Sequence, residues 1–250
     1  MYSSKVFNFT LCILFSILLS GCFEDSDTRL VKKCRAGDKS SCISALKVIN
    51  KNHHNDKSQT DLVHELSLKA CVLGAASVCD RIGSDFVRHD RYETGELVFA
   101  SEFFEYGCKL DYGPSCTHLA GIYANGRELR RNYPLAKKIF EKACNLSDGA
   151  GCFFLALMYE NGEGARRSKE TAFSYYEKGC NFKDFKSCTN LAGLYYTGEG
   201  TVKDLSQASV LYELACNNKV GQACLNLGNM YYKGFGTDKD YVRAYELYRL

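Results

Sequence analysis

Six pairs of cysteines at one fixed spacing constrain the fold of this chain more than any other feature. Within every pair, seven residues separate the two cysteines. The pairs are Cys34/Cys42, Cys71/Cys79, Cys108/Cys116, Cys144/Cys152, Cys180/Cys188 and Cys216/Cys224. The first cysteines of successive pairs lie 37, 37, 36, 36 and 36 residues apart. A constant spacing at a constant period indicates a repeat array, in which each unit contacts mainly its neighbours.

The residues that follow each second cysteine have a helical pattern. After Cys188, apolar residues return at the spacing of one helix face, and these are Leu191, Ala192, Tyr195 and Tyr196. Gly198-Glu199-Gly200 is expected to end this helix, because glycine favours the left-handed conformation at a helix C-terminus. A second run with helical periodicity extends from Leu205 to Cys216. Each repeat is therefore predicted to be a pair of helices, here called helix A and helix B.

The same residue types return in the other repeats. Helix A carries a Leu-Ala or Leu-Gly pair followed by a tyrosine, at Leu119/Ala120/Tyr123, Leu155/Ala156/Tyr159 and Leu227/Gly228/Tyr231. Helix B carries a central alanine followed four residues later by an aromatic residue, at Ala100/Phe104, Ala136/Phe140, Ala172/Tyr176 and Ala244/Tyr248. Small residues at fixed sites let two helices approach closely, while the aromatic rings fill the space beside them.

This unit resembles the Sel1-like repeat, a relative of the tetratricopeptide repeat, and the added cysteine pairs resemble those of the Helicobacter cysteine-rich protein subfamily. The resemblance covers residues 34–250 and is strongest from Cys108 onward. It implies an all-α fold, a right-handed α/α solenoid of helix-pair repeats stitched by disulfides. The first repeat departs from the pattern, because a polar loop over residues 51–60 replaces its G-x-G turn, and we expect this repeat to act as a cap.

The paired thiols favour disulfide bonds over a metal site. Cytosolic thiols are normally kept reduced, so 14 cysteines point to an oxidising compartment. Structural zinc sites usually bring cysteines together at gaps of about two to four residues, and no C-x-x-C occurs here. The histidines, His53, His54, His64, His89 and His118, follow no repeat register. We therefore expect no metal, and each pair should join the end of one helix B to the start of the next helix A.

Residues 1–21 have the pattern of a bacterial lipoprotein signal peptide. Lys5 gives a positive start, and Val6 to Leu19 form an apolar run that is short for a transmembrane span. The sequence Leu19-Ser20-Gly21-Cys22 resembles a lipobox, in which the cysteine is lipidated and becomes the first mature residue. We therefore expect Cys22 to anchor the chain to a membrane. The alternative is an ordinary signal peptide with an incidental cysteine, which would give a secreted protein.

The mature chain is expected to begin with a polar tether at residues 22–33 and to continue as the repeat array at residues 34–250. Phe23 follows the lipobox cysteine, which in lipoproteins favours the outer membrane, so we expect a location in the cell envelope facing the periplasm. The array should contain about six helix pairs. The period predicts a further cysteine at position 252, two residues after Leu250, so the last pair is expected to be incomplete.

Motifs with a catalytic meaning are weak. Ser44-Ala45-Leu46-Lys47 matches the S-x-x-K motif of penicillin-recognising enzymes, but the accompanying S-D-N and K-T-G elements are absent. His64-Glu65 begins like the zinc motif H-E-x-x-H, but Leu68 stands in place of the second histidine. The G-x-G segments follow helices rather than strands, so we interpret them as turns and not as phosphate loops. We predict no catalytic residue and no cofactor.

Charge and resemblance together indicate a binding protein. The net charge is +3 and no block of Lys or Arg stands out, so nucleic-acid binding is not expected. Curved helical arrays offer extended concave surfaces, and we expect a protein or peptide ligand there. The leading hypothesis is a lipid-anchored envelope scaffold with an adaptor or immunity role. The alternative, implied by resemblance to the cysteine-rich subfamily, is weak penicillin-binding or β-lactamase activity.

Overall fold

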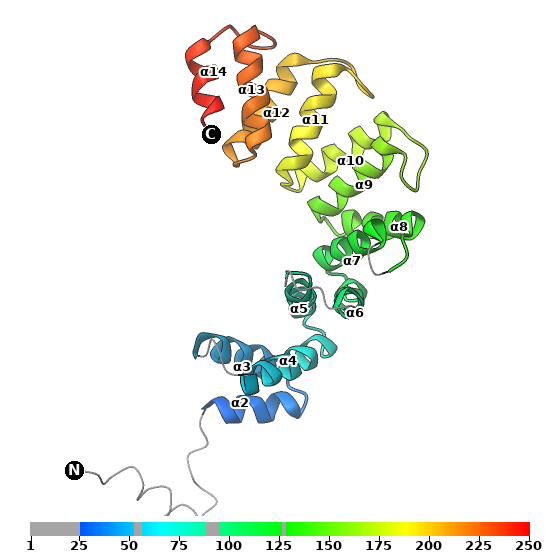
Figure 1. Cartoon of the computed structure of the whole chain (residues 1–250), viewed down its shortest axis with the longest axis vertical. Coiled ribbons are helices and arrows are strands. Elements are labelled where there is room, and N and C mark those ends of the chain that lie inside the picture. The colour runs from blue at the N-terminus through cyan, green and yellow to red at the C-terminus, as the bar shows by residue number, and fades with distance from the viewer. Residues whose placement is uncertain (1–25, 53–56, 89–95, 127–128) are drawn as a thin grey trace, which may run out of the picture. The chain divides into compact units, whose positions relative to one another are not determined.

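The computed structural model describes residues 26–52, 57–88, 96–126 and 129–250, and every regular element in these ranges is an α-helix (Figure 1). The helices are α2 (Ser26–Arg35), α3 (Lys39–Asn52), α4 (Lys57–Val72), α5 (Ala76–Arg88), α6 (Glu96–Lys109), α7 (Gly113–Asn125), α8 (Tyr133–Asn145), α9 (Gly149–Asn161), α10 (Lys169–Asn181), α11 (Phe185–Thr197), α12 (Leu205–Asn217), α13 (Gly221–Lys233) and α14 (Tyr241–Tyr248). From α3 onward, odd-numbered helices are helix A and even-numbered helices are helix B. The predicted all-α solenoid of helix pairs is confirmed.

The chain divides into two compact units, Met1–Leu73 and Gly74–Leu250. In the described part of unit 1, α2 packs against α3 and α4, and α3 packs against α4. Unit 2 contains α5 to α14, in which each helix packs against the next along the chain. In addition, α7 contacts both α5 and α9, and α9 contacts α11, so successive helices A lie side by side.

Helix α2 begins at Ser26, within the segment 22–33 for which the sequence predicts a polar tether. Leu30 and Val31 are partly buried and Cys34 is fully buried, so one side of this helix packs into unit 1. The few apolar residues of the segment are therefore enough to make it part of the fold. Residues 22–25, including Cys22, lie outside the described residues, as does the whole of the predicted signal peptide.

The glycines of the G-x-G segments end helix A as predicted. Gly162, Gly198 and Gly234 adopt the left-handed conformation, with φ between 72° and 80°, and each N–H donates to a carbonyl in the last turn. The second glycine has a different role. A Cβ atom on Gly200 would lie 2.4 Å from the carbonyl carbon of Lys169, so glycine lets this turn contact helix B of the preceding repeat.

The turn from helix B to the next helix A has the same backbone conformation in each described repeat of unit 2, and in two of them an aspartate caps the next helix. After Cys180, Lys183 takes the left-handed conformation with φ 65°, and the N–H of Asp184 donates to the carbonyl of Gly179. This is a Schellman motif, which ends a helix sharply. The Asp184 carboxylate then accepts from the N–H of Ser187 and caps the next helix. Asp111, Ser147 and Lys219 adopt the same left-handed conformation in the equivalent turns.

Disulfides close these turns. The structure contains the bonds Cys34–Cys42, Cys108–Cys116, Cys144–Cys152, Cys180–Cys188 and Cys216–Cys224, with Cα–Cα distances of 4.5 to 4.6 Å. Cys71 and Cys79 are also disulfide-bonded. Small residues directly before the cysteines permit this close approach, since a Cβ on Gly179 would lie 2.3 Å from Ser187 Oγ. Each of the five bonds whose Cα–Cα distances are given above joins one helix to the next along the chain.

Candidate functional site

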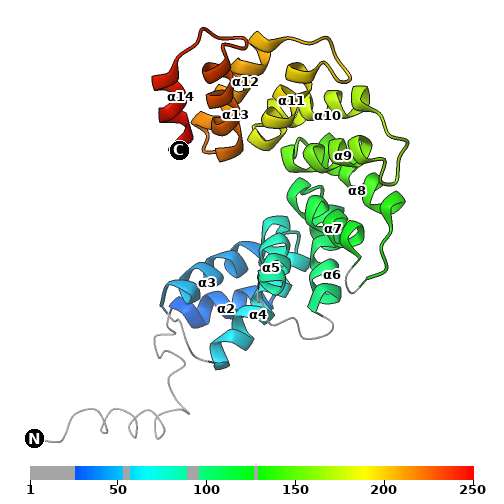
Figure 2. The same cartoon turned by 45° about the horizontal axis from the view of Figure 1, so that its top comes forward.

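Three cavities lined by described residues open along the helix A side of unit 2. The first, of about 500 Å³, lies between α5, α6, α7 and α9. The second, of about 300 Å³, lies between α9 and α13, and a third of about 190 Å³ shares Tyr212 and Asn226 with it. In Figure 2, α7, α9, α11 and α13 line the inner side of the curve that unit 2 describes. We call the surface that carries the three cavities the inner face.

Pairs of side chains connect each helix B of unit 2 to the next helix A. In each pair, the aromatic residue of helix B faces the residue that stands two positions after the second cysteine. We call these contacts the joint pairs. They are Phe104/His118, Phe140/Phe154, Tyr176/Asn190 and Tyr212/Asn226.

The first cavity contains a histidine that is held by a carboxylate. His118 Nδ1 lies 2.8 Å from Asp80 Oδ1, and Ser115 Oγ donates to the same oxygen over 3.0 Å. The His118 ring also packs on the Phe104 ring, with 4.9 Å between the ring centroids. The other walls are mostly apolar and include Val87, Leu97, Ile122 and Phe154. The cavity therefore combines apolar walls with one oriented imidazole.

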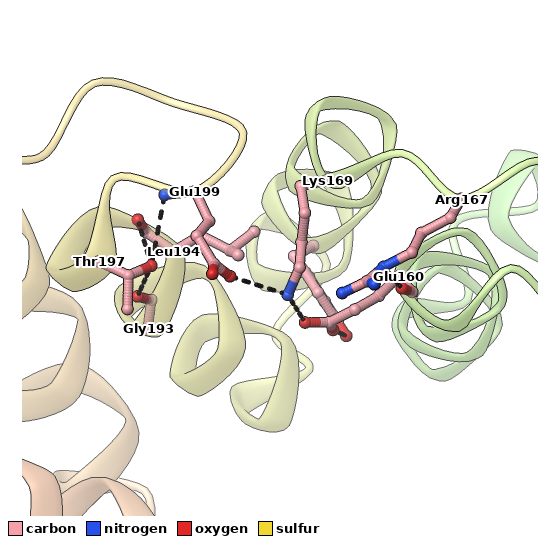
Figure 3. A network of polar contacts seen from close by, with 8 residues as sticks. Glu160, Arg167, Lys169, Gly193, Leu194, Thr197 and Glu199 are labelled. Atoms are coloured by element: carbon pink, nitrogen blue, oxygen red, sulfur yellow. Dashed lines mark hydrogen bonds and ion pairs between the residues drawn. The ribbon is translucent and has the colours of Figure 1, made fainter.

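The second cavity has charged and polar walls. Lys169 Nζ lies 2.5 Å from Glu160 Oε1 and 3.0 Å from Glu199 Oε2, so it bridges two carboxylates (Figure 3). The Tyr176 hydroxyl donates to Glu160 Oε2 over 2.6 Å. The remaining wall residues include the amides of Asn190, Gln222 and Asn226.

The charges of this network are stabilised in their ionised forms. Burial acts to raise the pKa of Glu160, but hydrogen bonds from Lys169 and Tyr176 outweigh it and hold the pKa below its usual value. The bond to Glu160 raises the pKa of Lys169. Burial raises the pKa of Tyr176 well above its usual range, and the bond to Glu160 adds to this rise. All three pKa values move away from neutrality, which suits binding better than acid–base catalysis.

The residues of the weak catalytic motif lie elsewhere. Ser44 is exposed on α3 in unit 1, and the side chain of Lys47 lies outside the described residues. The same holds for the side chain of His64 and for His53, His54 and His89. Among the described residues, no group of three or more His, Cys, Asp or Glu side chains is arranged to hold a metal ion. None of the described helices has both the length and the hydropathy that a membrane span requires.

The joint pairs are the site residues that sequence reasoning missed. Their signal is present in the period, because positions 118, 154, 190 and 226 lie 36 residues apart. The histidines share no register among themselves, but His118 occupies this repeated position. Each joint pair joins residues 14 positions apart across a turn, so the periodicity of a single helix does not reveal it.

The comparisons with known proteins agree with this architecture. The Sel1 repeat model matches residues 113–148, 149–181, 186–220 and 221–250, which together span more than half of the chain. A comparison with curated protein sequences finds no match.

Two solved structures show the same fold, and a third is similar over about half of the chain. A protective antigen with an SLR fold from uropathogenic Escherichia coli strains superimposes with a TM-score of 0.75 at 17% identity, over 90% of this chain and 48% of the antigen. The present chain thus spans about half the length of that antigen. A Sel1 repeat protein from Oxalobacter formigenes gives a TM-score of 0.65 at 18% identity, over 77% of both chains. Cysteine rich protein B of Helicobacter pylori gives 0.44 at 24% identity, over 54% of this chain and 96% of that one. From the repeat matches and the helix-pair architecture together, the chain belongs to the Sel1 repeat family.

Proposed function

We propose that this protein is a lipid-anchored scaffold of the cell envelope that binds a protein or peptide partner on the inner face, in an adaptor or immunity role. Sel1 repeats generally serve as protein-interaction scaffolds. The observation that carries the proposal is the set of three cavities lined by helices A of unit 2. Concave sites with a few oriented polar groups are typical of ligand recognition.

The side chains of the inner face support binding of an extended segment. The amides of Asn190, Asn226 and Asn229 already contact tyrosine hydroxyls of the protein. An amide has two donor hydrogens and two acceptor lone pairs, so each retains capacity that a peptide backbone can match. Phe154 lines the first cavity and is 42% exposed. An inner face with both polar and aromatic groups suits a polypeptide better than a uniformly charged ligand.

The cysteines and the N-terminal pattern support a location in the envelope. Disulfides persist in oxidising compartments, and the five described bonds would be lost in a reducing cytosol. The lipobox at Cys22 supports the anchor. Replacing Cys22 by Ser should move the protein from the membrane fraction to the soluble fraction and abolish metabolic labelling with a radioactive fatty acid. Membrane retention and labelling of this variant would contradict the anchor.

Selection of displayed peptides on the oxidised mature chain tests the binding role. The test variant is Gly193→Leu, because Gly193 lines the second cavity and a larger side chain would fill it. A Cβ atom at this position contacts only the Tyr212 hydroxyl, at 3.6 Å, so it fits without a clash. The control is Glu177→Leu, at an exposed helix B residue that lines none of the three cavities. Selected peptides should bind the wild type and the control equally and the test variant at least tenfold more weakly. Equal binding to all three would refute the inner-face site.

Ser44 gives no comparable support for β-lactam chemistry. It lies exposed on α3 in unit 1, and the inner face belongs to unit 2. The scaffold role is therefore the one function proposed.

A further inference from the structure

Gly121 in α7 has no packing reason to be glycine. It lies in the middle of the helix and lines the first cavity. Nothing lies within 4 Å of a Cβ atom built on it, whereas several other glycines of unit 2 would clash. Glycine inside a helix lowers stability relative to alanine. The absence of a side chain here keeps the cavity open.

His118 lines the same cavity, and its Nδ1 is held by Asp80. A carboxylate only accepts hydrogen bonds, so His118 Nδ1 carries the hydrogen that points to Asp80. In the neutral imidazole, Nε2 is then an acceptor. Asp80 is itself fixed by Ser115, whose side chain is fully buried. The ring is further held on Phe104, so Nε2 has one orientation.

The remaining walls include the polar residues Ser84, Thr117 and Asn125, and their apolar part suits a flat apolar group. Val87, Leu97 and Ile122 are aliphatic, and Phe154 offers a ring face that is 42% exposed. Phe154 is supported from behind by Phe140, with 5.3 Å between the ring centroids. Aromatic groups favour offset or edge-to-face contacts with such rings. A volume of about 500 Å³ accommodates a bicyclic side chain.

We propose that the first cavity binds an aromatic side chain that carries a hydrogen-bond donor, a tryptophan or a tyrosine of the partner polypeptide. The ring lies among Ile122, Leu97 and Phe154, and its N–H or O–H donates to His118 Nε2. This inference rests on the proposed function, because it names the residue type by which the partner is anchored. The second cavity, with its amides and paired charges, holds the adjoining backbone.

The absence of tryptophan from the chain makes the binding directly measurable. The probe is N-acetyl-tryptophanamide, whose indole fluorescence is selectively excited and shifts when the ring enters an apolar site. Oxidised full-length mature protein should bind it saturably. N-acetyl-1-methyltryptophanamide, which lacks the donor, should bind about tenfold more weakly, the usual effect of losing one hydrogen bond. Absence of saturable binding, or equal binding of the two probes, would overturn the proposal.

Three variants locate the site. Gly121→Leu fills the cavity and should abolish binding without lowering the melting temperature. Glu177→Leu, at an exposed helix B residue that lines none of the three cavities, is the control and should bind the probe like the wild type. His118→Phe copies the natural Phe140/Phe154 pair and should remove the preference for the unmethylated indole. Unchanged binding by Gly121→Leu would show that the indole binds elsewhere and overturn the assignment.

A competition experiment distinguishes a cavity that binds the side chain of a polypeptide from one that binds a free aromatic molecule. A short glycine-flanked tryptophan peptide should displace N-acetyl-tryptophanamide at equal or lower concentration. Failure of the peptide to compete would assign the cavity to small molecules and overturn its role in partner recognition. If selected peptides bind through the second cavity while no indole probe binds, the scaffold role stands and only this inference fails.

Discussion

The two halves of unit 2 use chemically different contacts at the same structural position. In the N-terminal half, the joint pairs are Phe104/His118 and Phe140/Phe154, which pack through their rings. In the C-terminal half, they are Tyr176/Asn190 and Tyr212/Asn226, in which a hydroxyl meets an amide. The helix B rings are 1%, 2%, 0% and 5% exposed along this series. The aromatic residues of helix B are therefore buried to a similar extent in both halves. The halves differ in whether that residue carries a hydroxyl, and a hydroxyl is found where the facing residue is an asparagine.

This difference indicates that the side chains of the joint pairs also determine whether the cavity walls of the inner face are polar or apolar. A buried hydroxyl is costly unless it has a hydrogen-bond partner, so tyrosine in helix B requires a polar residue in an adjoining helix A, as Glu160 provides for Tyr176. That polar residue then lines the second cavity. An apolar ring in helix B imposes no such requirement and leaves the first cavity largely apolar. The same side chains thus determine how the repeats stack and how polar the cavities are.

The apolar joint should be the most sensitive to truncation. Phe140→Ala removes a ring that is 2% exposed and packed against Phe154, so the free energy of unfolding should fall by about 3–5 kcal/mol. Urea denaturation followed by circular dichroism measures this loss. Phe140→Leu, which keeps much of the volume, is the control and should cost less. A loss below about 1 kcal/mol for the alanine variant would show that this joint does not depend on ring packing.

The disulfides should contribute equally to the two kinds of joint. Each bond closes a loop with a sequence separation of 8 residues, and the chain-entropy model gives about 2.5 kcal/mol for such a loop. The double substitutions Cys144→Ser/Cys152→Ser and Cys216→Ser/Cys224→Ser should therefore lower the melting temperature by similar amounts. Excess reductant should lower it further in the wild type. A large difference in melting temperature between the two double variants would mean that the side chains of the joint pair change how much the disulfide stabilises the fold.

Removing the Tyr176 hydroxyl should lower the free energy of unfolding less than removing the Phe140 ring. The size of this loss should depend on pH, because the hydroxyl donates to Glu160. Tyr176→Phe removes a donor to a paired carboxylate and should cost about 2 kcal/mol at neutral pH. The folded-state pKa of Glu160 lies below its usual value, so this stabilisation is present above the ordinary glutamate pKa, about 4.3. It is lost as the pH falls through the folded-state pKa. Denaturation at neutral and acidic pH should show the cost shrinking in acid, and a constant cost would exclude coupling to Glu160.

The smallest effect concerns the coupling within one joint pair. Tyr212→Phe and Asn226→Leu each break the contact between hydroxyl and amide, so the double variant should lose about 0.5–1 kcal/mol less than the sum of the single losses. A double-mutant cycle by urea denaturation measures this coupling. The pair Phe140→Leu and Asn226→Leu, whose members lie in different joints, serves as the additive control. Strict additivity within the Tyr212/Asn226 pair would show that the two residues are independent.

The repeat architecture could be predicted because its signals are local. The period of the cysteines, the G-x-G turns at Gly162 and Gly198, and the helix A pattern each depend on neighbouring residues. The sequence did not indicate helix α2 because its residues are mostly polar. Its two apolar residues, Leu30 and Val31, are seen to be partly buried only once α2 packs within unit 1. The left-handed conformation of Lys183 and Lys219 has no sequence signal, since lysine rarely adopts it and the turn imposes it.

The candidate site could be predicted only as a region. Repetition of helix pairs indicates a binding surface, but not which residues form its cavities. The role of His118 depends on Asp80, 38 residues earlier, and the Glu160–Lys169–Glu199 network joins three helices or turns. Such contacts arise when repeats stack, and they follow from the spacing of whole helices rather than from any single motif.

The local pairing of the cysteines has a consequence for how the protein matures. Eight cysteines already allow 105 pairings, and this chain has more, so random oxidation would trap most molecules in wrong isomers. Here the partners of each described bond are separated by 8 residues and meet as soon as one turn forms. A chain delivered residue by residue to an oxidising compartment would thus close each bond before the next pair arrives. Maturation in order along the chain would then require little help from a disulfide isomerase.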